Sequence, residues 1–160
     1  METTDILIQI RKIVRSINLE SKKIQKEYGV SIPQVLCLNY LRDAPNFQGT
    51  QGELKRFLNL NSSTISGIVN RLEKKGLVAR VPKSGDKRKV HIALTSAGDE
   101  LIASMPSLLH EQLSDKLLTL DESELKRIED SLDVLVHLLD IQSVEASPVI
   151  TIEGYLEDQE

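Results

Sequence analysis

The sequence predicts a mainly α-helical protein that carries one small β-hairpin. Three observations lead to this fold class. Over most of residues 6–142, apolar residues recur every three or four positions, which is the helical period. Between residues 77 and 94 the period changes to two, as in half-buried strands. Capping-type residues and glycines separate the periodic stretches, so the chain is predicted to form several helices.

The first predicted helix covers residues 6–28 and ends at Gly29. Lys and Arg stand between its apolar side chains, so the helix is amphipathic and one side of it needs a partner. The apolar side consists of Ile6, Ile10, Ile13, Ile17 and Ile24.

Two capping boxes open the next two predicted helices. Ser31 and Gln34 are spaced to open a second helix, which runs to about Arg42. The segment "DAPNFQG" then breaks the pattern. Thr50 and Glu53 are spaced to open a short third helix containing "LKRFLNL".

The fourth predicted helix, "NSSTISGIVNRLEKKG", begins with cap-type residues and ends at Gly76. After it, "LVARV" and "VHIAL" alternate as two strands, and the loop between them bends at Gly85 to form a hairpin. The side of the helix expected to face the core consists of Ile65, Ile68, Val69 and Leu72.

The last part of the pattern predicts two more helices. Thr95 is expected to cap a fifth helix that continues to about Leu118 and bends at Pro106. A capping box at residues 121–124 opens a sixth helix, which ends near Gln142. Residues 143–160 follow as a tail.

Charge is unevenly distributed along the chain. The formal net charge is -4, yet residues 50–95 contain ten Lys and Arg against three Asp and Glu. Residues 96–142 are acidic, and residues 143–160 contain five acids and no Lys or Arg. This distribution predicts one face for a polyanion and another for solvent or a partner subunit. Ordinary solvated charge is the alternative explanation.

Helix, short break, helix and hairpin is the order of a winged helix-turn-helix, which we assign to residues 31–95. In that unit the second helix enters the major groove, so its outward face is the candidate reading surface. Small hydroxyls and a glycine allow close approach to DNA, and Asn and Arg suit bidentate base contacts. A plain solvent-facing surface is the alternative. The outward face consists of Ser62, Ser63, Thr64, Ser66, Gly67, Asn70 and Arg71.

The hairpin loop concentrates positive charge and is the candidate phosphate-binding wing. Its basic residues, Lys83, Lys87, Arg88 and Lys89, can reach phosphates or a narrow minor groove. Asp86 lies two residues before Arg88, so its carboxylate can accept hydrogen bonds from the guanidinium and orient it. A solvated hairpin tip is the alternative.

Three segments together resemble the MarR family of bacterial transcription regulators: "SIPQVLCLNYL", "TQGELKRFLNLNSSTISGIVNRLEKKGLVAR" and "GDKRKVHIALTSAG". The resemblance covers roughly residues 5–142. The family's wing signature, Asp-Arg-Arg followed by alternating residues and Leu-Thr-x-x-Gly, matches this chain except that Lys87 replaces the first Arg. The matching positions are Asp86, Lys87, Arg88, Leu94, Thr95 and Gly98.

The resemblance implies a homodimeric repressor that binds a near-palindromic DNA operator and is released by a small effector or by ionic conditions. It also implies one domain over residues 1–160, with dimerisation helices in residues 1–30 and 96–142 and an acidic tail in residues 143–160. Because no motif marks an effector pocket, no residue is assigned to it. The stretch "IRKIVRSINLESKKIQKEYGVSIPQ" further resembles regulators of ectoine synthesis within the family.

Other function classes lack the residues they need. No apolar stretch reaches the roughly 18 residues of a membrane span, and the N-terminus does not resemble a signal peptide, so we expect a cytoplasmic protein. The single cysteine, Cys37, is interpreted as a core residue. Neither a cofactor nor a metal is expected, because His91, His110 and His137 are scattered. No catalytic motif is present, so the protein is not expected to be an enzyme.

Two functions therefore remain. One is a sequence-specific DNA-binding regulator, and the other is a dimeric interaction module whose basic surface binds an acidic partner. Preference for one DNA sequence over random duplex would distinguish them, because only the regulator requires it.

Overall fold

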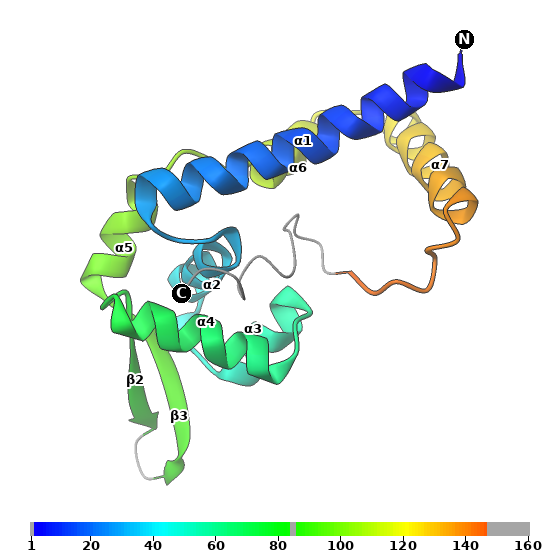
Figure 1. Cartoon of the computed structure of the whole chain (residues 1–160). Helices are drawn as coiled ribbons and strands as arrows, with labels where there is room; N and C mark the ends of the chain where they lie inside the picture. The colour runs from blue at the N-terminus through cyan, green and yellow to red at the C-terminus, as the bar shows by residue number, and fades with distance from the viewer. Residues whose placement is uncertain (1, 84–85, 147–160) are drawn as a thin grey trace. The chain divides into compact units, whose positions relative to one another are not determined.

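The computed structural model describes residues 2–83 and 86–146, and of residues 83 and 86–89 it describes the backbone alone. The chain falls into two compact units, Met1–Pro106 and Ser107–Ile150. The mainly helical fold with a small hairpin is confirmed (Figure 1). A single domain over residues 1–160 stays a prediction. Within the described ranges, no helix is long and apolar enough to cross a membrane.

Four helices of the first unit lie close to their predicted positions: α1 (Thr3–Tyr28), α2 (Ile32–Asp43), α3 (Gln51–Leu58) and α4 (Ser62–Lys74). The fifth, α5 (Ser96–Ala103), begins where it was predicted to begin. The predicted capping boxes of α2 and α3 are both present, with each cap side chain accepting from the backbone N–H three residues on. The predicted cap of α5 is present as well. These starts were predictable because capping involves only neighbouring residues.

A three-stranded antiparallel sheet follows the order β1-β3-β2. It comprises β1 (Gln48–Gly49), β2 (Val78–Lys83) and β3 (Asp86–Leu94). The hairpin was predicted, but β1 was not, because a two-residue strand has no period of its own. A 3-10 turn over Pro45–Phe47, with Asn46 at φ 56°, places β1 beside Ala93 and Ile92 of β3. This extra pairing ties the base of the hairpin to the segment before α3.

The core of the first unit surrounds α2. This helix contacts α1, α3, α4, α5 and β3. Val35, Leu36, Cys37 and Leu38 are consequently at most 2% exposed. Each fully buried Leu or Val side chain stabilises the fold by about 1.5–3 kcal/mol. The result is a well-packed lobe that holds α3 and α4 in place.

The prediction of one long fifth helix bent at Pro106 is wrong. α5 ends at Ala103, and a separate helix, α6, covers Leu109–Leu117. Proline lacks the N–H of the helical ladder and its ring clashes with the carbonyl four residues before it. The α conformation is also disfavoured for the residue that precedes proline. The chain therefore leaves the helix completely here, and Pro106 marks the end of the first unit.

The second unit contains α6 and α7 (Glu122–Leu138). The predicted capping box is present: the Asp121 carboxylate accepts from the Glu124 N–H at 2.8 Å, and the Glu124 carboxylate accepts from the Asp121 N–H at 3.1 Å. The predicted end of the helix near Gln142 is four residues too late. Asp140 has φ 56°, in the left-handed region that interrupts a helix.

Candidate nucleic-acid interface

α3 and α4 form a helix-turn-helix whose turn is fixed by two asparagines. Asn59 adopts φ 51° and closes α3 through its N–H to the Lys55 carbonyl. Asn61 caps α4, since its side-chain oxygen accepts from the Thr64 N–H and from the Ser63 hydroxyl, each at 2.8 Å. The cap therefore also orients the Ser63 hydroxyl at the exposed start of α4.

The inner side of α4 is fully apolar. Ile65, Ile68, Val69 and Leu72 are at most 1% exposed, as their helical spacing predicts. Burial of this side directs the polar residues outward. Ser62, Ser63 and Asn70 are exposed, and the partly exposed members of the same face are Thr64, Ser66, Gly67 and Arg71.

Ser66 is partly exposed on the polar face and also forms a hydrogen bond within the lobe. Its hydroxyl accepts a hydrogen bond from the Gln51 side-chain amide at 2.7 Å. Because Gln51 is the first residue of α3, this bond fixes the start of α3 against the middle of α4. Sequence reasoning missed Gln51, since a pair separated by 15 residues leaves no local pattern.

Arg80 of β2 is a second residue that sequence reasoning missed. Its guanidinium donates to the Asn70 side-chain oxygen at 2.7 Å and to the Glu73 carboxylate at 2.8 Å. The Arg80 backbone N–H also donates to Glu73 at 3.3 Å. These bonds fix the Asn70 amide with its oxygen toward the protein. Its two N–H donors are thereby left to face an acceptor.

Arg71 lies over the glycine of the same face. A Cβ atom added at Gly67 would lie 3.4 Å from Nη1 of Arg71. One turn further on, the Lys75 ammonium donates to the carbonyl of Gly29, at the end of α1. Burial, followed by the positive charge of Arg71, lowers the pKa of Lys75. α4 is thus held to α3 through Ser66 and to the end of α1 through Lys75.

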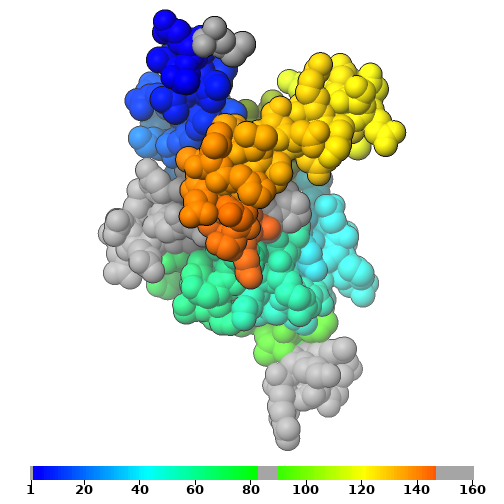
Figure 2. Space-filling view, turned by 90° about the vertical axis from the view of Figure 1, so that its right-hand side faces the viewer, coloured from blue at the N-terminus to red at the C-terminus, as the bar shows by residue number. Residues whose placement is uncertain are grey.

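The hairpin continues from the base of α4, and Figure 2 shows the described end of β3 (light green) next to the surface formed by α3 and α4. Its strands are longer than predicted, because β2 extends to Lys83 and β3 already begins at Asp86. Lys87, Arg88 and Lys89 therefore lie in a strand and not in a loop, which corrects the prediction. The described structure does not include the predicted bend at Gly85 or the side chains of the five wing residues, Lys83, Asp86, Lys87, Arg88 and Lys89. The predicted bond between Asp86 and Arg88 stays a prediction.

The remaining candidates from the sequence are the single cysteine and the three histidines. Cys37 is fully buried, and burial raises the pKa of its thiol to about 12, so the reactive thiolate is suppressed at neutral pH. In the part of the chain that the structure describes, no group of three or more His, Cys, Asp or Glu could hold a metal ion.

Comparison with known proteins supports the assignment of a winged helix-turn-helix regulator. Residues 28–89 match the MarR family model. The chain is 30% identical over 133 residues to the uncharacterized HTH-type transcriptional regulator YsmB of Bacillus subtilis (strain 168), covering 83% of this chain and 90% of that protein. It is 29% identical over 124 residues to the multiple antibiotic resistance protein MarR of Escherichia coli (strain K12), covering 72% and 84%.

Among solved structures, the S. aureus MepR–DNA complex superposes with a TM-score of 0.62 at 23% identity, covering 87% of this chain and 99% of that chain. This likeness shows a shared fold. The narrower resemblance to ectoine regulators stays a prediction. The relationship to YsmB over most of both sequences, together with the family match, shows the family. The chain therefore belongs to the MarR family of DNA-binding transcription regulators and is not an enzyme.

Proposed function

We propose that this regulator is a homodimeric repressor that acts in the cytoplasm on a near-palindromic operator in double-stranded DNA. In this proposal α4 lies in the major groove. The observation that carries it is the polar face of α4, whose small side chains would allow close approach to base edges. Solvent-facing helices more often carry the strong helix formers Glu, Lys and Gln.

The wing is proposed to bind the flanking phosphates or the minor groove. Its contact residues would be Lys83, Asp86, Lys87, Arg88 and Lys89, with Asp86 orienting Arg88. They belong to strands that the β1 pairing anchors to the lobe, so the tip would approach DNA on a fixed base.

Exposed apolar side chains support the homodimer. Ile6 and Ile13 of α1 are 45% and 59% exposed, and Leu132 of α7 is 53% exposed. Apolar stripes that extend along a helix usually mark an interaction surface. A second copy would cover them and place two α4 helices on two half-sites.

Release from the operator is proposed to follow binding of a small effector or a change in ionic conditions. The electrostatic part of DNA binding weakens as salt displaces the protein from the phosphates. The basic segment 50–95 makes this regulator sensitive to that effect.

The proposed function is tested by footprinting against DNA upstream of the protein's own gene and its neighbours. We expect a protected, inverted repeat that binds about 10³-fold or more tightly than random duplex. Equal affinity for both DNAs would reject the regulator and favour a basic interaction module. Transcription from the protected promoter in vitro should fall when the protein is added.

Substitutions on α4 are expected to change specificity more than general affinity. Asn70→Ala and Arg71→Ala should reduce the preference for operator over random DNA, because side chains at base edges read sequence. Lys83→Ala and Lys89→Ala should weaken binding to both DNAs alike and flatten the salt slope by about one per lost phosphate contact. Affinities for both DNAs across a salt series measure this. Equal losses on both DNAs from the α4 variants would contradict the assigned reading face.

The wing predicts a different pair of effects. Arg88→Ala should weaken operator binding by about 1–3 kcal/mol with almost unchanged thermal stability. Asp86→Ala should show part of the same loss, although it removes a negative charge, because Arg88 would lose its orienting partner. Tighter operator binding by the Asp86 variant would disprove the orienting role and leave only total charge.

A further inference from the structure

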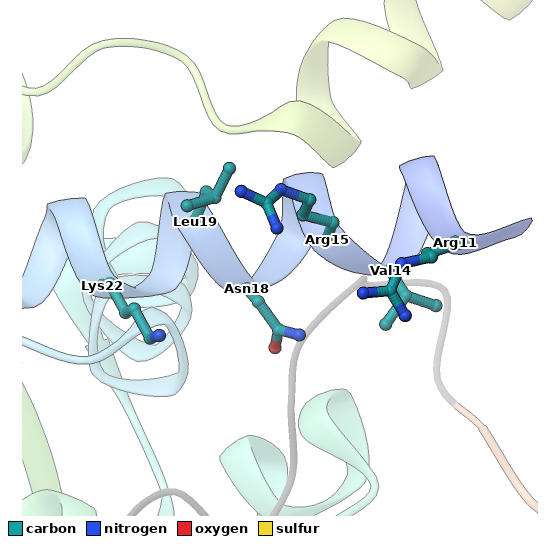
Figure 3. A pocket seen from close by; sticks show the side chains of 6 residues that line it. All are labelled: Arg11, Val14, Arg15, Asn18, Leu19 and Lys22. Carbon is teal, nitrogen blue, oxygen red and sulfur yellow. The ribbon is translucent and has the colours of Figure 1, made fainter. Parts of the chain in front are cut away.

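One face of α1 carries a groove that the proposed DNA-binding role does not use. The groove has a volume of about 300 Å³, and among the described residues those that line it all belong to α1, over about three turns (Figure 3). Positively charged side chains alternate in it with two apolar ones. The lining residues are Arg11, Val14, Arg15, Asn18, Leu19 and Lys22.

This groove is distinct from the isoleucine stripe of the same helix. At 3.6 residues per turn, its residues lie on average about 140° around the axis from the stripe that begins at Ile6 and ends at the buried Ile24. A dimer contact through the isoleucine stripe would therefore leave the groove accessible. The groove needs its own explanation.

The groove has unsatisfied charge and exposed apolar surface together. Arg11, Arg15 and Lys22 are exposed, and none of them forms an ion pair with another residue in the described ranges. Val14 and Leu19 between them are 52% and 53% exposed. An occupant that combines carboxylates with aliphatic or aromatic side chains would match both features.

We propose that the C-terminal segment 149–158 of this chain, "VITIEGYLED", docks in the α1 groove. Its apolar residues suit Val14 and Leu19, and its carboxylates suit the three cations. Glu153 and Asp158 are about 16 Å apart in an extended chain, and Arg11 and Lys22 are about 16 Å apart along the helix. Charges at the two ends of the segment can thus pair simultaneously.

The segment is also long enough to extend over the whole groove. The 14 residues that follow the last described residue, Ala146, span up to about 46 Å when extended. α1 has 26 residues and is about 39 Å long. Docking would neutralise the basic side of α1 and keep a negatively charged tail away from the DNA-binding lobe.

The test uses a single spin label on the full-length protein. Gln159→Cys introduces a labelling site beside the segment without removing an acid or an apolar residue, and the native Cys37 is buried with a raised thiol pKa, so it should not react. We expect selective loss of amide NMR intensity at residues 11–22. A mixture of labelled and isotope-enriched chains shows whether the segment belongs to the same or the second copy, and either result supports docking.

Charge reversal supplies the decisive comparison. Glu153→Lys, Glu157→Lys and Asp158→Lys together should abolish the intensity loss and leave the folded units unchanged. Adding Arg11→Glu, Arg15→Glu and Lys22→Glu should restore it. Lys12→Glu with Lys23→Glu is the matched control, because these exposed cations lie about 100° around α1 from the groove.

Three results would overturn the proposal. They are an intensity loss centred on α4 or the hairpin, no selective loss in the unsubstituted chain, and a loss at residues 11–22 that survives reversal of the tail charges. The tail-reversed variant alone is sufficient if the α1 variant does not fold.

Discussion

Replacement of Leu132 and Leu135 by Glu is expected to abolish the dimer and operator binding together. Both leucines lie on one apolar stripe of α7, and Leu132 is 53% exposed. Two buried charges in a subunit interface should cost about 4 kcal/mol or more, since a single central truncation often costs about 2 kcal/mol. This corresponds to about 10³-fold weaker dimerisation. Sedimentation and operator titration of the same samples measure both losses.

The matched control places the same chemistry on another side of α7. Val134 and Leu138 are even more exposed, at 57% and 77%, but lie about 100–140° around the helix from the stripe. Val134→Glu with Leu138→Glu should therefore retain dimers and binding.

Half-sites in the operator should be separated by about 10 base pairs, or roughly 34 Å. A folded monomer of 17.9 kDa that bound one full operator with undiminished affinity would refute this architecture.

Gly98→Ala is expected to destabilise the first unit strongly. A Cβ atom at this position would lie 2.2 Å from the Leu77 carbonyl oxygen and 2.7 Å from a methyl carbon of Leu94. The carbonyl belongs to the backbone and accepts from the Thr95 N–H, so it cannot move without breaking that bond. Overpacking of this kind costs about 3 kcal/mol. Chemical denaturation of wild type and variant at 25 °C measures the difference.

Gly52→Ala is the control for the chemical change itself. The added Cβ would lie 3.9 Å from its nearest neighbours, the side chains of Arg56 and Thr50, so it fits without displacement. Alanine is favoured over glycine in a helix by about 1 kcal/mol, and this variant should be equally stable or more stable. Similar losses of stability at both glycines would show that close packing at Gly98 is not the cause.

The sequence was sufficient for features that depend on neighbours along the chain. Ser31, Thr50, Thr95 and Asp121 cap the helices that they were predicted to cap, because a cap bond spans only three residues. The start of α6 was missed for the same reason: its N-cap is Leu108, which has no side-chain oxygen to mark it.

The candidate interface likewise has one part that the local sequence predicts and one part that depends on a tertiary contact. The outward side of α4 was predictable because helical period alone separates Ile65 and Ile68 from Ser62 and Asn70. The bond from Arg80 that orients Asn70 was not, because it joins a strand to a helix ten residues earlier. A reading face can thus be located from its period, whereas the orientation of one amide depends on a tertiary contact.

By itself, the sequence determined helices α1 to α4 and the start of α7, the four predicted caps, the hairpin and the polar face of α4, since local hydrogen bonds and apolar periodicity decide them. Tertiary structure alone decided that β1 joins the sheet, that Gln51 holds Ser66, and that Gly98 must lack a side chain. Each of these depends on atoms that are distant in sequence and meet only when the core of the first unit packs. Their energies arise from that packing and are not encoded in any local pattern.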